Sequence, residues 1–198
     1  MTSILFVCKL AGALFVITGG GAVGAGYAYR LRKRLDNLKE LERIVIHIEN
    51  DIRYRHSIIS MAFKSASARC HKPFSDWLVF LSERLDDAGR LIDDNERFRD
   101  FIDCDFDDNT YEFCEIWNSS LIYLKDNSFL HEEDIDYLKT LGQTLGYLDI
   151  TAQEIGIKLF LENLHAKINE ISANLTDKIR ISIIAGMVSG IFIVVLLV

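Results

Sequence analysis

The sequence is poor in residues that interrupt helices and in patterns that build strands. It holds one proline, Pro73, and its four cysteines form no C-x-x-C pair. Strand-like alternation of apolar and polar residues is nearly absent. These absences exclude a β-rich fold and argue against a disulfide framework or a cysteine-ligated zinc site. We therefore expect an all-α protein with reduced thiols.

Charged residues are missing from both ends of the chain. Of all Lys, Arg, Asp and Glu, only Lys9 precedes Arg30, and none follows Arg180. The part between carries 21 basic and 29 acidic residues, a net charge of −8. Because a phosphate-binding surface needs clustered Lys and Arg, this acidic excess argues against nucleic acid as a partner.

The uncharged ends are long enough to cross a membrane. Residues 10–29 contain no charge and would measure about 30 Å as a helix, the thickness of the hydrocarbon core. Residues 181–198 are equally uncharged and would reach about 27 Å. We predict an N-terminal transmembrane segment over 1–29, a helical domain over 30–180 and a C-terminal transmembrane helix over 181–198.

Basic residues border both spans on the side of the middle domain. The cluster behind the first span consists of Arg30, Arg32, Lys33 and Arg34. Lys178 and Arg180 precede the second span. A basic run after an apolar segment is the reverse of a cleaved secretory signal, which favours a retained span. By the positive-inside rule, we predict that the middle domain is cytoplasmic and interpret the cluster as a topology signal.

Each span also has glycines four positions apart. These are Gly20 and Gly24 in the first span, and Gly186 and Gly190 in the second. In lipid, such spacing permits close approach of helix backbones. It fits pairing of the two spans or homo-oligomerisation, although glycine is also common in membrane helices for neither reason.

Apolar residues recur at spacings of three and four through the middle domain, which predicts helices. The predicted helices cover residues 31–69, 74–88, 110–125 and 131–148, with a further short one near 95–102. Gly89 is expected to end the second helix, and Asp149 to be the N-cap of a last helix that runs into the membrane. Its apolar stripe over 157–175 has heptad spacing, which fits either packing within the chain or a coiled coil.

Motifs that would carry catalysis or bind a cofactor are lacking. There is no Walker A motif. Asp103, Asp105 and Asp107 have the spacing of the first calcium ligands of an EF-hand, but Asp108 and Cys114 stand where that loop needs Gly and Glu. We interpret the acidic stretch 86–108 as a solvated loop that could dock onto a basic partner. We expect no enzyme activity, no metal and no cofactor; a metal-dependent membrane enzyme is a rival hypothesis.

Gly142 and Gly146 lie one turn apart in a predicted helix. Each weakens the helix by about 1 kcal/mol relative to alanine. We expect tight packing of a neighbouring helix over these glycines to offset that cost; a frayed helix end at Gly146 is the alternative. Tyr54 and Trp117 are predicted to be buried anchors.

The order of these features resembles the stage III sporulation protein AB family. Residues 51–54 read Asp-Ile-Arg-Tyr, close to the E-I-x-Y string of that family, and Trp117 matches its tryptophan. The most specific match is an L-G-x-x-L-G-x-x-D…Q string, formed here by Leu141, Gly142, Leu145, Gly146, Asp149 and Gln153. The acidic stretch 86–108 is longer than the family pattern.

The resemblance implies a role in the sporulation of an endospore-forming bacterium. It implies a small relative of the F-type platform proteins of type II secretion, in the outer membrane around the forespore. Its helical domain would contact a separate secretion-type ATPase and other membrane subunits of a channel between mother cell and forespore. A non-enzymatic platform or scaffold subunit is thus the predicted function. A membrane-tethered regulator or receptor that signals through the 157–175 stripe is the alternative.

Overall fold

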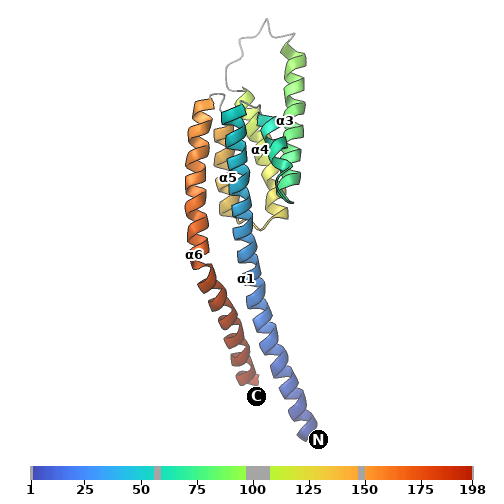
Figure 1. The fold of residues 1–198 in the computed structure, drawn as a ribbon. Coiled ribbons are helices and arrows are strands. Elements are labelled where there is room, and N and C mark those ends of the chain that lie inside the picture. Colours follow the sequence, from blue (N-terminus) through green and yellow to red (C-terminus); the bar gives the residue numbers. More distant parts are fainter. Residues whose placement is uncertain (1, 56–58, 97–107, 147–149, 198) are drawn as a thin grey trace. The chain divides into compact units, whose positions relative to one another are not determined.

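The computed structural model describes residues 2–55, 59–96, 108–146 and 150–197. Over these residues the chain is all-α and contains no strand, which confirms the predicted fold class (Figure 1). In chain order the helices are α1 (Thr2–Arg55), α2 (Ile59–Ser67), α3 (Phe74–Glu96), α4 (Asp108–Asn127), α5 (Glu132–Leu145) and α6 (Ile150–Leu197).

The chain divides into two compact units. One, here called the terminal unit, joins Met1–Asp36 with Ile168–Val198. The other, here called the central unit, is Asn37–Lys167. Both α1 and α6 contribute residues to each unit. The membrane boundaries at residues 29 and 181 stay a prediction, since a division by contacts does not locate a bilayer.

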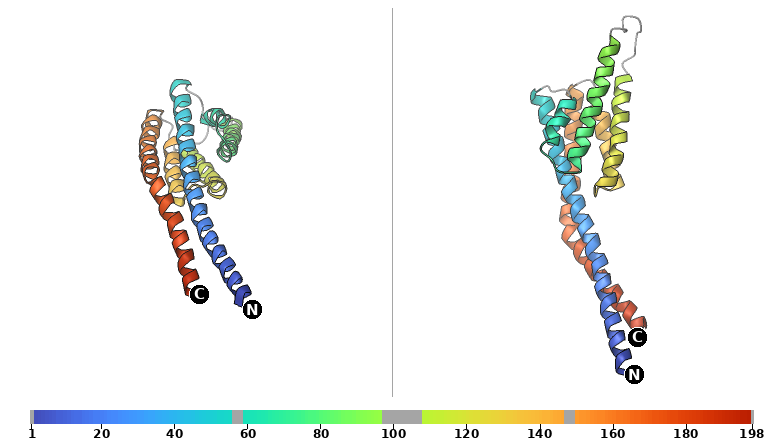
Figure 2. Two further views of the ribbon diagram at one scale, coloured as in Figure 1. Left: turned by 60° about the horizontal axis from the view of Figure 1, so that its bottom comes forward. Right: turned by 90° about the vertical axis from the view of Figure 1, so that its right-hand side faces the viewer.

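The central unit is a bundle around one apolar core. Helix α2 packs on α3, α3 on α4, and α4 on α5, and Figure 2 shows α3 and α4 side by side. Each helix supplies side chains at helical spacing that are at most 2% exposed, among them Leu38, Ile48, Phe63, Phe74, Trp77, Leu81, Trp117, Leu124, Leu138, Leu141, Ile157 and Leu164. The apolar periodicity of the sequence is therefore the periodicity of this core.

Several helix boundaries differ from the predicted ones, and α4 is two residues longer at each end than the predicted 110–125. Helix α3 passes Gly89 and ends at Glu96, because one glycine inside a helix costs only about 1 kcal/mol. The predicted helix over 31–69 is divided between α1 and α2. The first apolar segment belongs to the same helix as Leu31, because neither glycine nor proline stands between them, and α1 therefore begins at Thr2. Helix α5 ends at Leu145, three residues before the predicted end.

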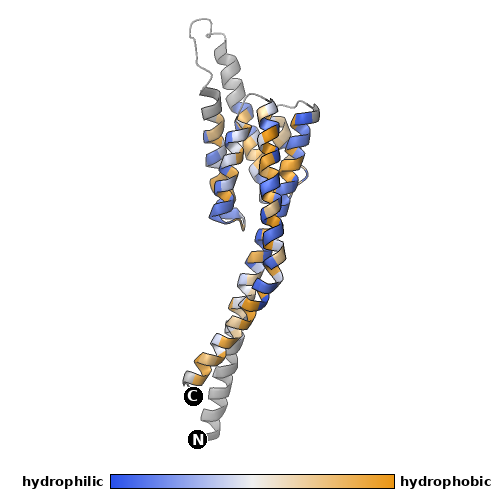
Figure 3. Cartoon of the chain, turned by 90° about the vertical axis from the view of Figure 1, so that its left-hand side faces the viewer, coloured by the Kyte–Doolittle hydropathy of each residue, from blue (hydrophilic) through white to orange (hydrophobic). Residues whose placement is uncertain are grey.

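Helix α6 carries the most apolar part of the terminal unit. Within the described residues, the segment Thr151–Val195 is long and apolar enough to cross a membrane, and its most apolar stretch is almost wholly exposed. In Figure 3, where the ribbon is coloured by hydropathy, hydrophobic residues predominate toward the C-terminal end of α6. The side chains of residues 1–11, 13–15 and 17 lie outside the described part, so the first span stays a prediction.

Candidate functional site

The backbone of α5 at Gly142 is covered by the indole of Trp117 from α4. A Cβ atom added at Gly142 would meet the indole, with Nε1 only 2.5 Å and Cγ 2.6 Å away. Nε1 donates a hydrogen bond of 2.9 Å to the carbonyl oxygen of Leu138. In a regular helix that carbonyl also accepts from the residue four positions on, which is Gly142. The missing side chain therefore leaves room for a tryptophan to reach a carbonyl inside a helix.

Trp117 lies at the centre of an aromatic cluster. It is fully buried, and its ring centroid lies 5.3 Å from that of Trp77, 5.9 Å from that of Phe63 and 6.1 Å from that of Phe113. The indole of Trp77 donates to the hydroxyl of Ser120 at 2.8 Å. Both indole N–H groups thus have acceptors, as buried tryptophans require.

The turn from α5 to α6 uses the rest of the glycine string. Gly146 is the C-cap of α5, in a right-handed helical conformation, and its N–H donates to the carbonyl oxygen of Gly142 at 3.0 Å. The buried Gln153 of α6 donates from Nε2 to the carbonyl oxygen of Leu145 at 2.9 Å. This bond satisfies one of the last carbonyls of α5, which the helix itself leaves without a partner. Gly146 therefore lies at the end of α5, where the sequence had allowed a packing face or a helix end.

Two further residues of this region lie outside the description. Asp149, the predicted N-cap of α6, falls among residues 147–149, which are outside the described residues. Tyr54 belongs to α1, but its side chain is likewise outside the described part. The roles of both stay predictions.

Sequence reasoning missed an ion pair that links the buried Asp134 of α5 to the half-buried Lys167 of α6. Asp134 is 2% exposed, and its carboxylate accepts from the backbone N–H of His131 at 2.9 Å and from Nζ of Lys167 at 2.8 Å. The first contact closes the N-terminus of α5. The spacing Asp134 to His131 is a local capping signal, whereas nothing in the sequence points to Lys167.

Helices α5 and α6 also line a half-open cavity of about 150 Å³. The rings of Tyr137 and Phe160 stack at its wall with centroids 4.5 Å apart. Burial raises the pKa of Tyr137, against a smaller lowering from its hydrogen bond with Asn163. A Cβ atom at Gly156 would collide with the methyl group of Thr144. The walls offer hydroxyls and apolar surface, and no group of acids, histidines or cysteines that could hold a metal was found among the described residues.

In the terminal unit, the glycines of α1 meet those of α6. A Cβ atom at Gly20 would collide with the carbonyl oxygen of Gly186 and lie 3.7 Å from Cα of Gly190. A Cβ atom at Gly24 would lie 2.6 Å from the carbonyl oxygen of Ser182. The hydroxyl of Ser182 donates to the carbonyl oxygen of Gly24 at 3.2 Å. The structure thus brings all four predicted glycines into one contact, and adds a serine that the sequence did not single out.

The predicted topology residues lie just beyond this contact on α1. Arg30 and Arg32 are exposed, Lys33 is half-buried, and Arg34 is buried at 8% exposure. Residues 97–107 of the acidic stretch, with Asp103, Asp105 and Asp107, lie outside the described residues. The interpretation of the EF-hand-like spacing as a solvated loop therefore stays a prediction.

Comparison with known proteins shows the family. The profile of the stage III sporulation protein AB family matches residues 9–94 and 96–198. The chain belongs to the stage III sporulation protein AB family. Its role therefore lies in sporulation.

Two relatives agree with the AB family profile. The stage III sporulation protein AB of Bacillus subtilis (strain 168) is 23% identical over 189 residues, which cover 96% of this chain and 98% of that protein. A solved structure of a stage III sporulation protein AB (SpoIIIAB) matches with a TM-score of 0.56 and 22% identity, over 72% of this chain and 96% of that one. That similarity supports the fold. In this member of the family, residues of the glycine string take part in the contacts of α5 with Trp117 and with α6.

Proposed function

We propose that this protein is a non-enzymatic platform subunit of a secretion-like complex that links mother cell and forespore during sporulation. The observation that carries the proposal is the family match over nearly the whole chain. In the proposal, the paired apolar parts of α1 and α6 anchor the protein in the outer forespore membrane. The central unit faces the mother-cell cytoplasm and binds a separate secretion-type ATPase and other membrane subunits.

The packing of the chain supports a scaffold. The conspicuous sequence features of both units take part in helix contacts: Gly142 with Trp117, Gln153 with the end of α5, and Gly20 with Gly186. Such contacts fix a shape rather than perform chemistry. The acidic charge of the central unit, 26 acidic against 15 basic residues over 37–167, also disfavours nucleic acid and favours a basic protein surface as partner.

The 157–175 stripe does not favour the alternative of a regulator that signals through a coiled coil. Ile157, Leu164 and Ile168 are at most 4% exposed within the chain, and Leu161, Ile171 and Leu175 are half-buried. A seam that is already covered is a poor surface for a second chain.

Co-purification from sporulating cells tests the proposal. The full chain, tagged and extracted in mild detergent, should bring down a secretion-type ATPase and small membrane proteins, identified by mass spectrometry. A variant with reversed charges at exposed positions of α3, Glu83→Lys with Asp86→Lys and Asp87→Lys, should lose the ATPase if a basic surface docks there. Recovery of the chain alone or as a lone dimer would contradict the platform function.

A further inference from the structure

The two units carry opposite net charges. Residues 37–167 hold 26 acidic and 15 basic residues, a net charge of −11. The terminal unit holds 3 acidic and 7 basic residues, a net charge of +4. The positive charge of the terminal unit is not spread along it, because only Lys9 lies on the apolar part of α1 and none lies beyond Arg180. Its cations therefore gather where the apolar segments end.

The register of the helix pair brings cations from both ends of the chain to one level. Gly20 contacts Gly186, and Gly24 contacts Ser182, so the helices are antiparallel. Continued by one turn, this register sets Ala28 beside Lys178. Arg30 and Arg32 of α1, with Lys178 and Arg180 of α6, then fall within a band about 9 Å deep, at a rise of about 1.5 Å per residue. We call these four residues the cationic collar.

The collar side chains are available to a ligand. All four are exposed. None of them makes an ion pair with another residue of the described chain, whereas several cations of the central unit do, such as Lys139 with Asp136 at 2.6 Å. Asp177 is the one acidic residue of the band. Arg34 is not counted in the collar, because it is buried and has an interaction partner of its own.

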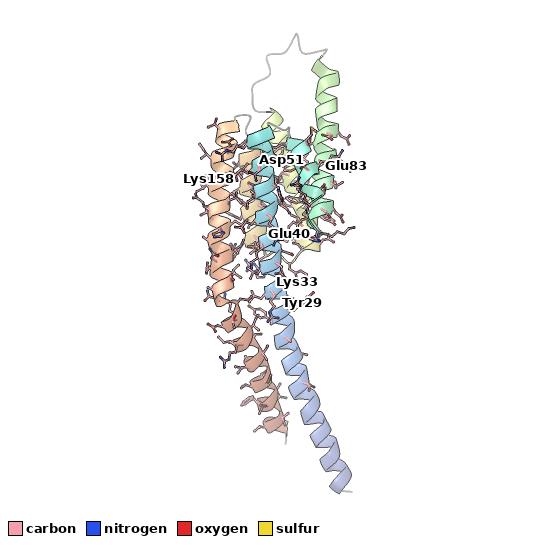
Figure 4. All side chains as sticks on the ribbon, in the orientation of Figure 1. Tyr29, Lys33, Glu40, Asp51, Glu83 and Lys158 are labelled. Atoms are coloured by element: carbon pink, nitrogen blue, oxygen red, sulfur yellow. The ribbon has the colours of Figure 1, made fainter. Side chains whose placement is uncertain are left out.

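Aromatic and apolar side chains surround the collar. Tyr27 and Tyr29 lie at the same level of α1 and are 55% and 56% exposed. Nζ of Lys33 lies 5.7 Å from the centroid of the Tyr29 ring, one turn along α1 (Figure 4). Ile181 and Ile184, 66% and 51% exposed, follow the collar on α6. Tyrosines where an apolar helix segment gives way to basic residues are typical of the membrane interface, with the hydrocarbon on one side and headgroups on the other.

We propose that the cationic collar binds the phosphate headgroups of anionic phospholipids. Topology alone requires positive charge near each span. The structure goes further, because it gathers unpaired cations from two distant segments around one helix pair, beside exposed tyrosines and above exposed isoleucines. Basic clusters at this position attract anionic lipids, and guanidinium groups bind phosphate with paired hydrogen bonds. The inference rests on the membrane insertion that is part of the proposed function.

Lipid retention by the full chain tests the collar. The protein is purified in detergent with an equal mixture of phosphatidylglycerol and phosphatidylcholine, and bound lipids are counted by native mass spectrometry. The collar variant is Arg30→Gln, Arg32→Gln, Lys178→Gln and Arg180→Gln. The matched control is Lys39→Gln, Lys64→Gln, Arg69→Gln and Lys158→Gln, which removes the same charge from exposed positions of the central unit.

The wild-type chain and the control should retain phosphatidylglycerol in preference to phosphatidylcholine. The collar variant should lose that preference by at least about tenfold, since each basic residue near a surface contributes appreciably. An unchanged preference in the collar variant, or an equal loss in the control, would overturn the inference. Displacement of the lipid by excess inorganic phosphate at constant ionic strength would also overturn it, because the collar would then be a general anion site.

Flotation separates this inference from the proposed function. All three proteins should float with vesicles of phosphatidylcholine alone, because insertion depends on the apolar helices. A wild-type chain that fails to float would overturn both the membrane anchor and the collar. A chain that floats but shows no headgroup preference would overturn the collar alone.

Discussion

At the scale of single residues, the tryptophan that covers Gly142 explains why this position is a glycine. Its hydrogen atom occupies the place where a methyl group would overlap the Trp117 indole. The same contact leads Nε1 to the Leu138 carbonyl oxygen. One glycine therefore serves both the packing and the hydrogen bonding of a buried ring, which explains why a weak helix former stands inside α5.

Gly142→Ala should lower the free energy of unfolding. Alanine favours a helix by about 1 kcal/mol over glycine, but overpacking a filled core costs about 1–3 kcal/mol, and a displaced indole would leave a buried donor unpaired at about 1–3 kcal/mol. We expect a net loss of about 1–5 kcal/mol, measured by urea denaturation of the full chain in detergent with circular dichroism.

Gly26→Ala is the matched control, because a Cβ atom there has nothing within 4 Å. It should leave the midpoint unchanged or raise it slightly. In a Trp117→Leu background, Gly142→Ala should cost less, since the colliding ring is gone. A Gly142→Ala midpoint equal to that of the wild type would refute the packing role.

Cys70 is a thiol whose surroundings suppress its ionisation. Burial and then the Glu40 carboxylate raise the pKa of Cys70 to about 11. Because the folded state favours the neutral thiol, its contribution to stability is complete below the ordinary thiol pKa near 9 and is lost as the pH rises toward 11.

Alkylation of Cys70 by iodoacetamide at pH 8 should be at least about tenfold slower in the folded chain than in urea, because the thiolate reacts. The Glu40→Gln variant should react faster than the wild type when folded, and equally fast when unfolded. Mass spectrometry of the Cys70 peptide gives the rates. Equal rates in folded and unfolded chains would show that the thiol is not protected.

At the scale of helices, the terminal unit depends on a glycine contact between α1 and α6. Gly20 and Gly24 permit backbone approach on one face of α1, and the Ser182 hydroxyl adds a hydrogen bond across it. A Cβ atom added at Gly19, one residue away, would have nothing within 4 Å. Neighbouring glycines of the same helix therefore have different roles.

Gly20→Val should push α1 and α6 apart, because its side chain would collide with the backbone at Gly186. Spin labels at Ala22→Cys and Ile184→Cys, in a chain without native cysteines, should report a longer and broader distance distribution in lipid nanodiscs. Gly19→Val adds the same side chain on the open face and should leave the distance unchanged. A widening of equal size in both variants would show that the contact has no such role.

At the scale of the whole molecule, the predicted topology places the acidic central unit in the cytoplasm. The basic cluster after residue 29 and the pair before residue 181 favour that side. The exposed Met61 lies in α2 of the central unit. Met61→Cys, in a chain without native cysteines, should resist a membrane-impermeant maleimide in intact cells and react after permeabilisation.

When the chain is produced in non-sporulating cells and inserts into the cytoplasmic membrane, Thr2→Cys should behave in the opposite way if both termini lie across that membrane. Labelling of the Met61→Cys chain in intact cells would show that the central unit lies on the opposite side of the membrane. A mature chain without its first thirty residues would instead show that the first apolar segment is a cleaved signal.

Much of the architecture was readable from the sequence because it depends on local order. Apolar spacing of three and four residues predicted an all-α chain, and the scarcity of proline left the helices long. The string from Leu141 to Gln153 indicated the family before any comparison. Helix ends were less readable: α3 continued through Gly89, because a modest helix penalty is easily outweighed by its neighbours.

The tertiary structure alone decided which partner each residue meets. The sequence put Gly142 on a packing face, but Trp117, 25 positions earlier, became its cover only when α4 met α5. The glycines of the two spans could equally have faced another copy of the chain, and here they face each other. Asp134 and Lys167 were two charges among many until α5 and α6 brought them within 2.8 Å. Local spacing fixes a helix and its faces, whereas the choice among faces is a competition between distant surfaces, which only the folded chain resolves.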